Sequence, residues 1–260
     1  MTDYPQTLSL AGKRGLVVGI ANDESIAWGC ARALHGLGAE LAITWLNDKA
    51  RVHAEPLANQ LQASLKMPLD VSRDGDLERL FECIQQQWER LDFIVHSLAS
   101  APKDELRGRL VDSSSAGFLQ AMDVSCHSFI RMARLAEPMM NNGGCLVTMS
   151  YQGANNAVEG YALMGPVKAA LESSVRYLAS ELGPQGIRVH AISPGPMPTR
   201  AASGLRDFDK LVDQAIAHSP LRRLVTLEEV GGLCAWPVSD ASRGQTGGVH
   251  FVDGGLNILG

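Results

Sequence analysis

Tyr161 and Lys168 are the residues whose types and spacing point most directly to chemistry. They stand seven residues apart, about two turns of an α-helix, so a helix would present both side chains on one face. A phenol with a pKa of about 10 stays protonated at neutral pH and can donate to an oxygen that becomes negative as hydride arrives nearby. An ammonium beside it stabilises that oxyanion and can bind a cofactor ribose. Tyr151, ten residues earlier, can line the same pocket, and we predict that all three are catalytic.

A tyrosine and a lysine at this spacing also occur by chance. The position of the pair in the chain is what favours a catalytic role. Both residues follow a strand-like run that ends at Met149, and ligands of parallel sheets bind beyond the strand ends. Pro166 stands between them and would remove a hydrogen bond from a helix interior. We therefore expect the regular helix to begin near Met164, with Tyr161 in an irregular turn before it.

Residues suited to a dinucleotide follow the first strand-like run. Gly19 precedes a helix start at Ser25 and Ile26, an arrangement that turns backbone N–H groups and the helix dipole toward a pyrophosphate. The spacing is not GxGxxG, because the next glycine is Gly29. A glycine turn closed by a serine N-cap explains this segment equally well when it is taken alone.

Three further strand ends favour the ligand-binding interpretation. Asp70 and Val71 follow the third run, where a carboxylate can accept the adenine amino group. The small residues 97–101 follow the fourth run and let a cofactor approach the backbone closely. Residues 194–199 follow the sixth run as a rigid turn, whose Thr199 hydroxyl can hold a carboxamide. Each of these ends is also consistent with a plain turn, but four on one sheet edge indicate a dinucleotide site.

The elements that must position these residues alternate along the chain. Short apolar runs separated by helical patterns predict a parallel sheet with right-handed crossovers. The expected strands are Gly15–Val18, Glu40–Trp45, Ser64–Leu69, Phe93–His96, Gly144–Met149, Arg188–Ile192 and Val249–Val252. The expected helices include Ser25–Leu37, Leu77–Glu89, Phe118–Asn141, Met164–Leu182, Asp207–His218 and Leu227–Trp236. The prediction is an α/β fold, a doubly wound, Rossmann-type parallel sheet of about seven strands with helices on both faces, in one domain of residues 1–260.

Composition argues against several classes of protein. The net charge of −5 disfavours nucleic acid as a partner, no apolar run reaches the ~20 residues of a membrane helix, and the first residues lack a secretory signal. The five cysteines form no CxxC pair and the histidines are scattered, so we expect no metal site, no disulfides and a cytoplasmic location. His96 is expected to support the site through a hydrogen bond rather than to act as a base.

Together these motifs resemble the divergent branch of the short-chain dehydrogenase/reductase superfamily, the enoyl-acyl-carrier-protein reductases. The shared pattern is Gly-x5-Ser-Ile-Ala-x-Gly at 19–29, Asp70-Val71, Val95-His-Ser97, Ser150-Tyr151-x-Gly153, Tyr161-x6-Lys168, Gly-Pro-x-x-Thr-x-Ala-Ala-Ser-Gly at 195–204, and Asp253-Gly-Gly255. The mainstream Tyr-xxx-Lys pair is absent, because residue 164 is Met.

The resemblance implies NADH-dependent reduction of the 2,3 double bond of trans-2-enoyl thioesters on acyl carrier protein, in fatty acid biosynthesis. Tyr161 would hydrogen-bond the thioester carbonyl, and Lys168 would hold the ribose hydroxyls. The residues implied to bind the cofactor are Gly19, Ser25, Ile26, Leu46, Asp70, Val71, Ser97, Ala99, Lys168, Met197 and Thr199. Those implied to bind the substrate are Ala101, Tyr151, Tyr161, Met164, Ala201 and Phe208, with 201–205 in a mobile element that closes over it. The family also implies a homotetramer.

The end of the second run bears on the choice of cofactor. Leu46 stands where many relatives carry a polar or basic residue, and a leucine cannot neutralise a 2′-phosphate. Asp48 would repel that phosphate. We therefore predict a preference for NADH, and NADP stays open because Lys49 and Arg51 follow closely.

Departures from the commonest pattern leave two other functions open. They include Pro166, Ser193-Pro194 and Trp236-Pro237. The enzymatic alternative is an NAD(P)-dependent ketone or alcohol oxidoreductase on the same scaffold. The non-enzymatic alternative is a dinucleotide-binding sensor that lacks catalysis, and the intact Tyr161 and Lys168 argue against it.

Overall fold

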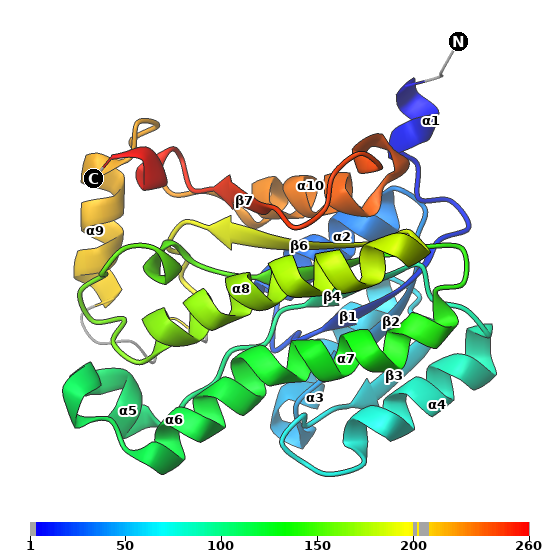
Figure 1. The fold of residues 1–260 in the computed structure, drawn as a ribbon. Coiled ribbons are helices and arrows are strands. Elements are labelled where there is room, and N and C mark those ends of the chain that lie inside the picture. Colours follow the sequence, from blue (N-terminus) through cyan, green and yellow to red (C-terminus); the bar gives the residue numbers. More distant parts are fainter. Residues whose placement is uncertain (1–3, 200–201, 203–207, 260) are drawn as a thin grey trace.

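A seven-stranded parallel sheet forms the centre of the molecule in the computed structural model, which describes residues 4–199, 202 and 208–259 (Figure 1). Its strand order is β3-β2-β1-β4-β5-β6-β7, and all neighbouring strands run parallel. The strands are β1 (Arg14–Val18), β2 (Glu40–Trp45), β3 (Leu65–Pro68), β4 (Phe93–His96), β5 (Gly144–Met149), β6 (Ile187–Pro194) and β7 (Val249–Val252). The predicted doubly wound sheet is confirmed, and the strand order changes direction between β1 and β4, where ligands of such sheets bind.

Helices cover both faces of this sheet. One face carries α2 (Ile26–Gly36), α3 (Asp48–Gln60) and α10 (Leu227–Val238), and the other carries α4 (Asp76–Trp88), α7 (Ser128–Ala136) and α8 (Met164–Leu182). Side chains of a strand alternate between the faces, so Leu16 and Val18 pack with the second group while Val17 packs with the first. Burial on both faces explains why β2, β4 and β5 read as nearly continuous apolar runs, whereas the edge strands β3 and β7 are only partly buried.

Four further α-helices lie in the described part of the chain. They are α1 (Tyr4–Leu8), α5 (Lys103–Arg107), α6 (Ser115–Met122) and α9 (Phe208–His218). Asp207, the expected first residue of α9, lies outside the described residues. None of the helices in the described part of the chain combines the length and apolar character that crossing a membrane requires.

The long helix predicted at Phe118–Asn141 is wrong as a single regular element. The chain forms α6, then a π-helical turn at Asp123–His127, then α7, and then a short 3-10 turn at Glu137–Met139. The Ser128 hydroxyl donates to the Val124 carbonyl oxygen at 2.7 Å, a side-chain bond that competes with the helical backbone pattern. Pro138 lies in the 3-10 turn and has no N–H to continue an α-helix.

The C-terminal end of α10 also differs from the prediction. Helix α10 continues through Pro237 to Val238, although the expected helix ended at Trp236. Near the last turn, proline forfeits one backbone hydrogen bond and interrupts nothing that follows. At the other end the helix begins with a capping box, in which Thr226 and Glu229 satisfy each other's backbone N–H groups.

Candidate functional site

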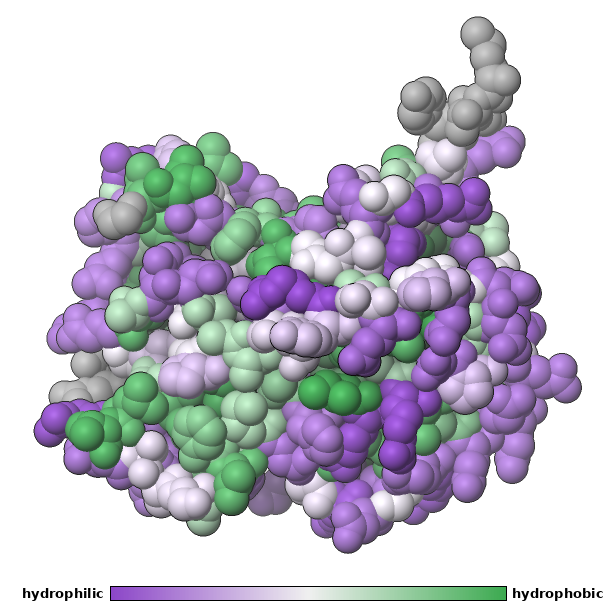
Figure 2. Space-filling view, in the orientation of Figure 1, coloured by the Kyte–Doolittle hydropathy of each residue, from purple (hydrophilic) through white to green (hydrophobic). Residues whose placement is uncertain are grey.

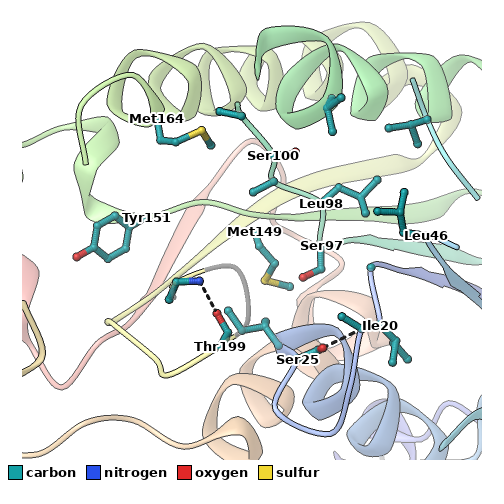
Figure 3. A pocket seen from close by; sticks show the side chains of 18 of the residues that line it. Ile20, Ser25, Leu46, Ser97, Leu98, Ser100, Met149, Tyr151, Met164 and Thr199 are labelled. Atoms are coloured by element: carbon teal, nitrogen blue, oxygen red, sulfur yellow. Dashed lines mark hydrogen bonds between the residues drawn. The ribbon is translucent and has the colours of Figure 1, made fainter. Parts of the chain in front are cut away.

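A cavity of about 620 Å³ runs along the carboxyl-terminal edge of the sheet. Figure 3 shows Leu46, after β2, and Tyr151, after β5, at opposite ends of the view. The structure brings most of the predicted site residues to its walls, namely Gly19, Ser25, Ile26, Leu46, Asp70, Val71, Ser97, Ala99, Ala101, Tyr151, Tyr161, Met164, Lys168, Met197 and Thr199. Residues from both ends of the chain therefore meet in one space.

Two predicted substrate residues are not found there. Ala201 lies outside the described residues. Phe208 begins α9 and is not among the residues that line the cavity, whereas Leu211, almost one turn later, does line it. Sequence reasoning missed Leu106, Gln120 and Val124, which line the cavity from α5, α6 and the π-helical turn. No local pattern marks them, because their position depends on how these short helices dock.

The turn after β1 has the close approach that a dinucleotide site needs. Gly19 has a φ of +103°, and a Cβ there would lie 2.1 Å from the Ser97 carbonyl oxygen. Only glycine fits both the left-handed backbone and this contact. The cavity thus reaches bare backbone at the ends of β1 and β4, which suits the approach of a pyrophosphate.

Ser25 stands at the N-cap position of α2, where the plain-turn alternative placed it. Its side chain makes no bond to the helix; instead it accepts from the N–H groups of Ala21 and Asn22, both at 3.0 Å. The hydroxyl therefore fixes the preceding loop. The first N–H groups of an α-helix have no partners inside the helix, and those of α2 start at Ile26, on the cavity wall. This donor set suits a phosphate.

The end of β2 offers no cation to an additional phosphate. Leu46 is 55% exposed, and Asn47 caps α3 by accepting from the Ala50 N–H at 3.2 Å. The exposed Arg51 pairs with Glu55 at 3.0 Å and so lies on a solvated face of α3. Among the described lining residues, Lys168 is the single lysine and there is no arginine.

Asp70 lines the cavity beyond β3 with its carboxylate already oriented. One carboxylate oxygen accepts from the Ser72 N–H at 3.1 Å and from the Ser72 hydroxyl at 2.6 Å, and the other lies 3.4 Å from Nε of Arg73. These contacts fix the carboxylate at the cavity wall and leave lone pairs for a further donor.

Tyr161 occupies the irregular turn predicted before α8. The helix begins at Met164, with Pro166 in its first turn, and the Met164 N–H donates to the Tyr161 carbonyl at 3.0 Å. Ala162 follows with a φ of 37°, a strained conformation for a residue other than glycine. The strain falls directly beside a candidate catalytic residue, where such backbone is often found.

The environment of Tyr161 keeps its phenol protonated. The side chain is 8% exposed, and its ring lies 4.8 Å from that of Tyr151. A Cβ on Gly153 would come within 2.5 Å of the Tyr161 ring, so a glycine is required beneath it. Burial raises the pKa of the Tyr161 phenol. No described residue hydrogen-bonds its hydroxyl, which lines the cavity as a donor without a protein partner.

Lys168 is a buried cation on the same helix. It is 4% exposed, and its ammonium donates to the Met149 carbonyl oxygen at 2.6 Å. Burial lowers the pKa of Lys168 to about 8, while Cys126 and Glu172 raise it in opposition. The ammonium form therefore still predominates at neutral pH.

His96 supports the site as predicted and does not act as a base. Its Nδ1 lies 2.8 Å from the Thr148 hydroxyl and its Nε2 lies 2.8 Å from the Ser128 hydroxyl. Since Ser128 donates to Val124, the His96 Nε2–H donates to Ser128, and Nδ1 accepts from Thr148. Burial, and then the charge of Lys168, lower the pKa of His96 to about 3, so it is neutral at physiological pH. It joins β4 to β5 through Thr148 and to the start of α7 through Ser128.

The turn after β6 forms another part of the cavity wall. The Thr199 N–H donates to the Met197 carbonyl at 2.7 Å, and the Thr199 hydroxyl accepts from the Ala202 N–H at 3.2 Å (Figure 3). None of the described residues accepts the hydroxyl proton of Thr199, which can therefore donate to a ligand. This geometry suits the carboxamide assigned to this turn.

Apolar side chains gather on the surface over α5 and α6 (Figure 2). Leu110, Val111 and Leu119 are 45%, 73% and 65% exposed. Leu106 of α5 lines the cavity, so this segment contributes both to the surface and to the cavity wall. Within the described ranges, no three His, Cys, Asp or Glu side chains are grouped as a metal site would need.

Comparison with known proteins agrees with this geometry. A family model described as enoyl-(acyl carrier protein) reductase matches residues 19–257. The enoyl-[acyl-carrier-protein] reductase [NADH] of Salmonella typhimurium is 46% identical over 96% of this chain and 95% of its own. A crystal structure of the Anaplasma phagocytophilum reductase in complex with NAD has a TM-score of 0.92 at 46% identity and 96% coverage of both chains. The Bacillus cereus enoyl-acyl carrier protein reductase, solved with NADP⁺ and an indole naphthyridinone, has a TM-score of 0.94 at 43% identity, over 96% of this chain and 98% of its own.

Proposed function

The chain belongs to the enoyl-(acyl carrier protein) reductase family, and we propose that it reduces trans-2-enoyl thioesters on acyl carrier protein with NADH, in fatty acid biosynthesis. One observation carries the assignment of the chemistry to this chain's residues. Tyr161, a buried residue whose hydroxyl has no hydrogen-bond partner among the described residues, and Lys168, a buried ammonium, line the same cavity, which extends to the glycine turn at Gly19. That arrangement provides a donor for a developing oxyanion and a cation for a ribose.

The residues present fit a bound nicotinamide dinucleotide. Gly19 and the N-terminus of α2 suit the pyrophosphate, Asp70 the adenine amino group, Lys168 the ribose hydroxyls and Thr199 the carboxamide. When bound, the reduced nicotinamide supplies a hydride to the β-carbon of the enoyl thioester. Preference for NADH over NADPH is supported by the missing cation beside Leu46.

Tyr161 stabilises the charge that develops on the substrate. As the β-carbon gains hydride, the thioester oxygen becomes negative, and the Tyr161 hydroxyl donates a hydrogen bond to it. Because burial raises the pKa of this phenol, it remains a donor throughout the pH range in which the enzyme works. Lys168 adds positive charge from the same wall. Protonation of the substrate α-carbon completes the saturated thioester.

The acyl chain is assigned to the cavity end near α5 and α6. Met164, Ala101, Leu106 and Val124 give this end an apolar surface that suits a hydrocarbon chain. Tyr151 packs against Tyr161 and holds its ring in place.

Loss of NADH absorbance with crotonyl and longer enoyl thioesters tests the proposed function. Turnover is expected with enoyl thioesters and not with simple ketones or alcohols. Turnover with ketones and none with enoyl thioesters would instead support the alternative oxidoreductase on this scaffold.

We further propose that the chain is one domain, a homotetramer and cytoplasmic. We assign the contacts between subunits to the long helix α8, on which Tyr177 is 68% exposed and which would pack against its copy in an isologous interface. All five cysteines are free thiols, as a reducing compartment requires. Light scattering at micromolar concentration should give four times the mass of one chain, and cell fractionation should recover the protein in the soluble cytoplasmic fraction.

A further inference from the structure

Glu172 is a buried carboxylate to which the proposed reaction gives no role. It lies one turn after Lys168 on α8 and is 4% exposed. A buried charge is costly unless it is paired and hydrogen-bonded. The partners that it has therefore indicate what it does.

Those partners are the two ends of the segment that carries Tyr151. The Ser150 hydroxyl donates to Oε1 of Glu172 at 2.5 Å, and the Asn155 side-chain amide donates to Oε2 at 3.1 Å. Lys168 contacts the same stretch of chain, since its ammonium donates to the carbonyl of Met149. Helix α8 thus holds residues 149–155 at three points.

The Glu172 carboxylate also acts on the Lys168 ammonium through its charge, at a longer range than an ion pair. Glu172 and Lys168 are four residues apart on one helix, which places them on the same face. The other titratable groups that face Lys168 are Cys126 of the π-helical turn, His96 of β4 and the phenol of Tyr161. Burial keeps each of these three neutral near pH 7, by raising the pKa of Cys126 and Tyr161 and lowering that of His96. Glu172 is therefore the carboxylate among the groups that face Lys168.

We propose that Glu172 is a positioning residue of the reduction site: its carboxylate fixes the Tyr151 segment through Ser150 and Asn155 and maintains Lys168 as an ammonium. The inference rests on the proposed function for Tyr151 and Lys168, and it has two parts that different substitutions separate.

Glu172→Gln tests the charge. The amide has nearly the same shape and can still accept from Ser150 through its oxygen. Its NH2 group can donate to the Asn155 side-chain oxygen once that amide turns over, so the change removes mainly the negative charge. Titration of NADH by nicotinamide fluorescence across pH 6 to 10 should show affinity falling in the parent as Lys168 loses its proton near its pKa of about 8. In Glu172→Gln the fall should begin about one unit lower. At pH 8 that shift leaves about fivefold less ammonium, and NADH affinity should drop about fivefold.

Ser150→Ala combined with Asn155→Ala tests the attachment of the Tyr151 segment. Both partners are removed while the carboxylate stays. Turnover of enoyl thioesters should fall about tenfold, a barrier change of ~1.4 kcal/mol. The pH dependence of NADH binding should remain that of the parent.

The matched control is Glu181→Gln, which removes an exposed carboxylate from the same helix. Turnover and the pH dependence of NADH binding should not change in this variant. The charge role is overturned if the NADH titrations of Glu172→Gln and parent coincide. The attachment role is overturned if the double variant reduces enoyl thioesters at the parental rate. This test of the attachment role remains available if Glu172→Gln fails to fold. A parent protein that binds NADH but reduces no enoyl thioester would refute the proposed function alone, because the NADH titration of Glu172→Gln still tests the charge.

Discussion

Tyr161→Phe separates the chemistry of this site from its architecture. The substitution removes one hydroxyl, and no described residue hydrogen-bonds that hydroxyl. The ring keeps its packing against Tyr151 at 4.8 Å and its place above Gly153. Folding therefore loses no hydrogen bond, and the free energy of unfolding should change by less than ~0.5 kcal/mol.

The rate should change far more than the stability. In a buried site, a donor aimed at a developing oxyanion lowers the barrier by about 2–4 kcal/mol. Removing it should reduce kcat for enoyl thioesters about 30- to 900-fold. NADH affinity should stay within about threefold of the parent, because Lys168 and the turn at Gly19 are untouched.

Three measurements on one preparation check this expectation. They are steady-state reduction of an enoyl thioester, NADH titration by fluorescence, and thermal unfolding. Tyr177→Phe is the matched control, since Tyr177 lies on α8 and is 68% exposed. An unchanged kcat in Tyr161→Phe would refute the role of the hydroxyl, unless adding Tyr151→Phe abolished turnover and so transferred the role to Tyr151.

Three other predictions follow from the walls of the cavity. Lys168→Ala should weaken NADH binding at least tenfold at pH 7. It should also remove the loss of NADH affinity that we expect in the parent as the pH rises through about 8. Unchanged NADH binding in a fluorescence titration would confine Lys168 to a structural role. Gly19→Ala should weaken NADH binding and cost ~1–3 kcal/mol of unfolding free energy, because the new Cβ meets the Ser97 carbonyl at 2.1 Å on a backbone with φ of +103°; a parental denaturation midpoint would contradict it. The parent should favour NADH, and Leu46→Arg should raise kcat/KM for NADPH about tenfold, or ~1.4 kcal/mol; a parent preference for NADPH would mean that another cation reaches the 2′-phosphate.

The parts of the fold that were predicted correctly have causes that are local in sequence. Strands buried on both faces need apolar residues at successive positions, so β2, β4 and β5 have the predicted bounds. The edge strand β7 also has the predicted bounds, although it is only partly buried. Helix α8 begins at Met164 as predicted because Pro166 is tolerated only in a first turn. In both cases the signal lies within the segment itself: a run of apolar residues for the strands, and one proline for the helix.

What was missed depends on partners that are distant in sequence. The π-helical turn between α6 and α7 accompanies the hydrogen bond from Ser128 to Val124. Ser128, at the start of α7, is in turn hydrogen-bonded by His96 of β4. Glu172 has the sequence context of a solvated helix face, and its burial follows only from Ser150 and Asn155 folding over it. Spacing within one segment carries no signal for either feature.

Burial of this site has opposite effects on its two proposed catalytic groups. Desolvation raises the pKa of Tyr161 and so preserves the phenol as a donor, but the same desolvation lowers the pKa of Lys168 and favours its neutral amine. A site that was only apolar would thus gain a donor and lose a cation. Cys126 and Glu172 oppose the second effect by raising the pKa of Lys168, and the Met149 carbonyl accepts a hydrogen bond from its ammonium. Tyr161 has no such partner among the described residues, so the substrate oxygen is left to complete its hydrogen bond.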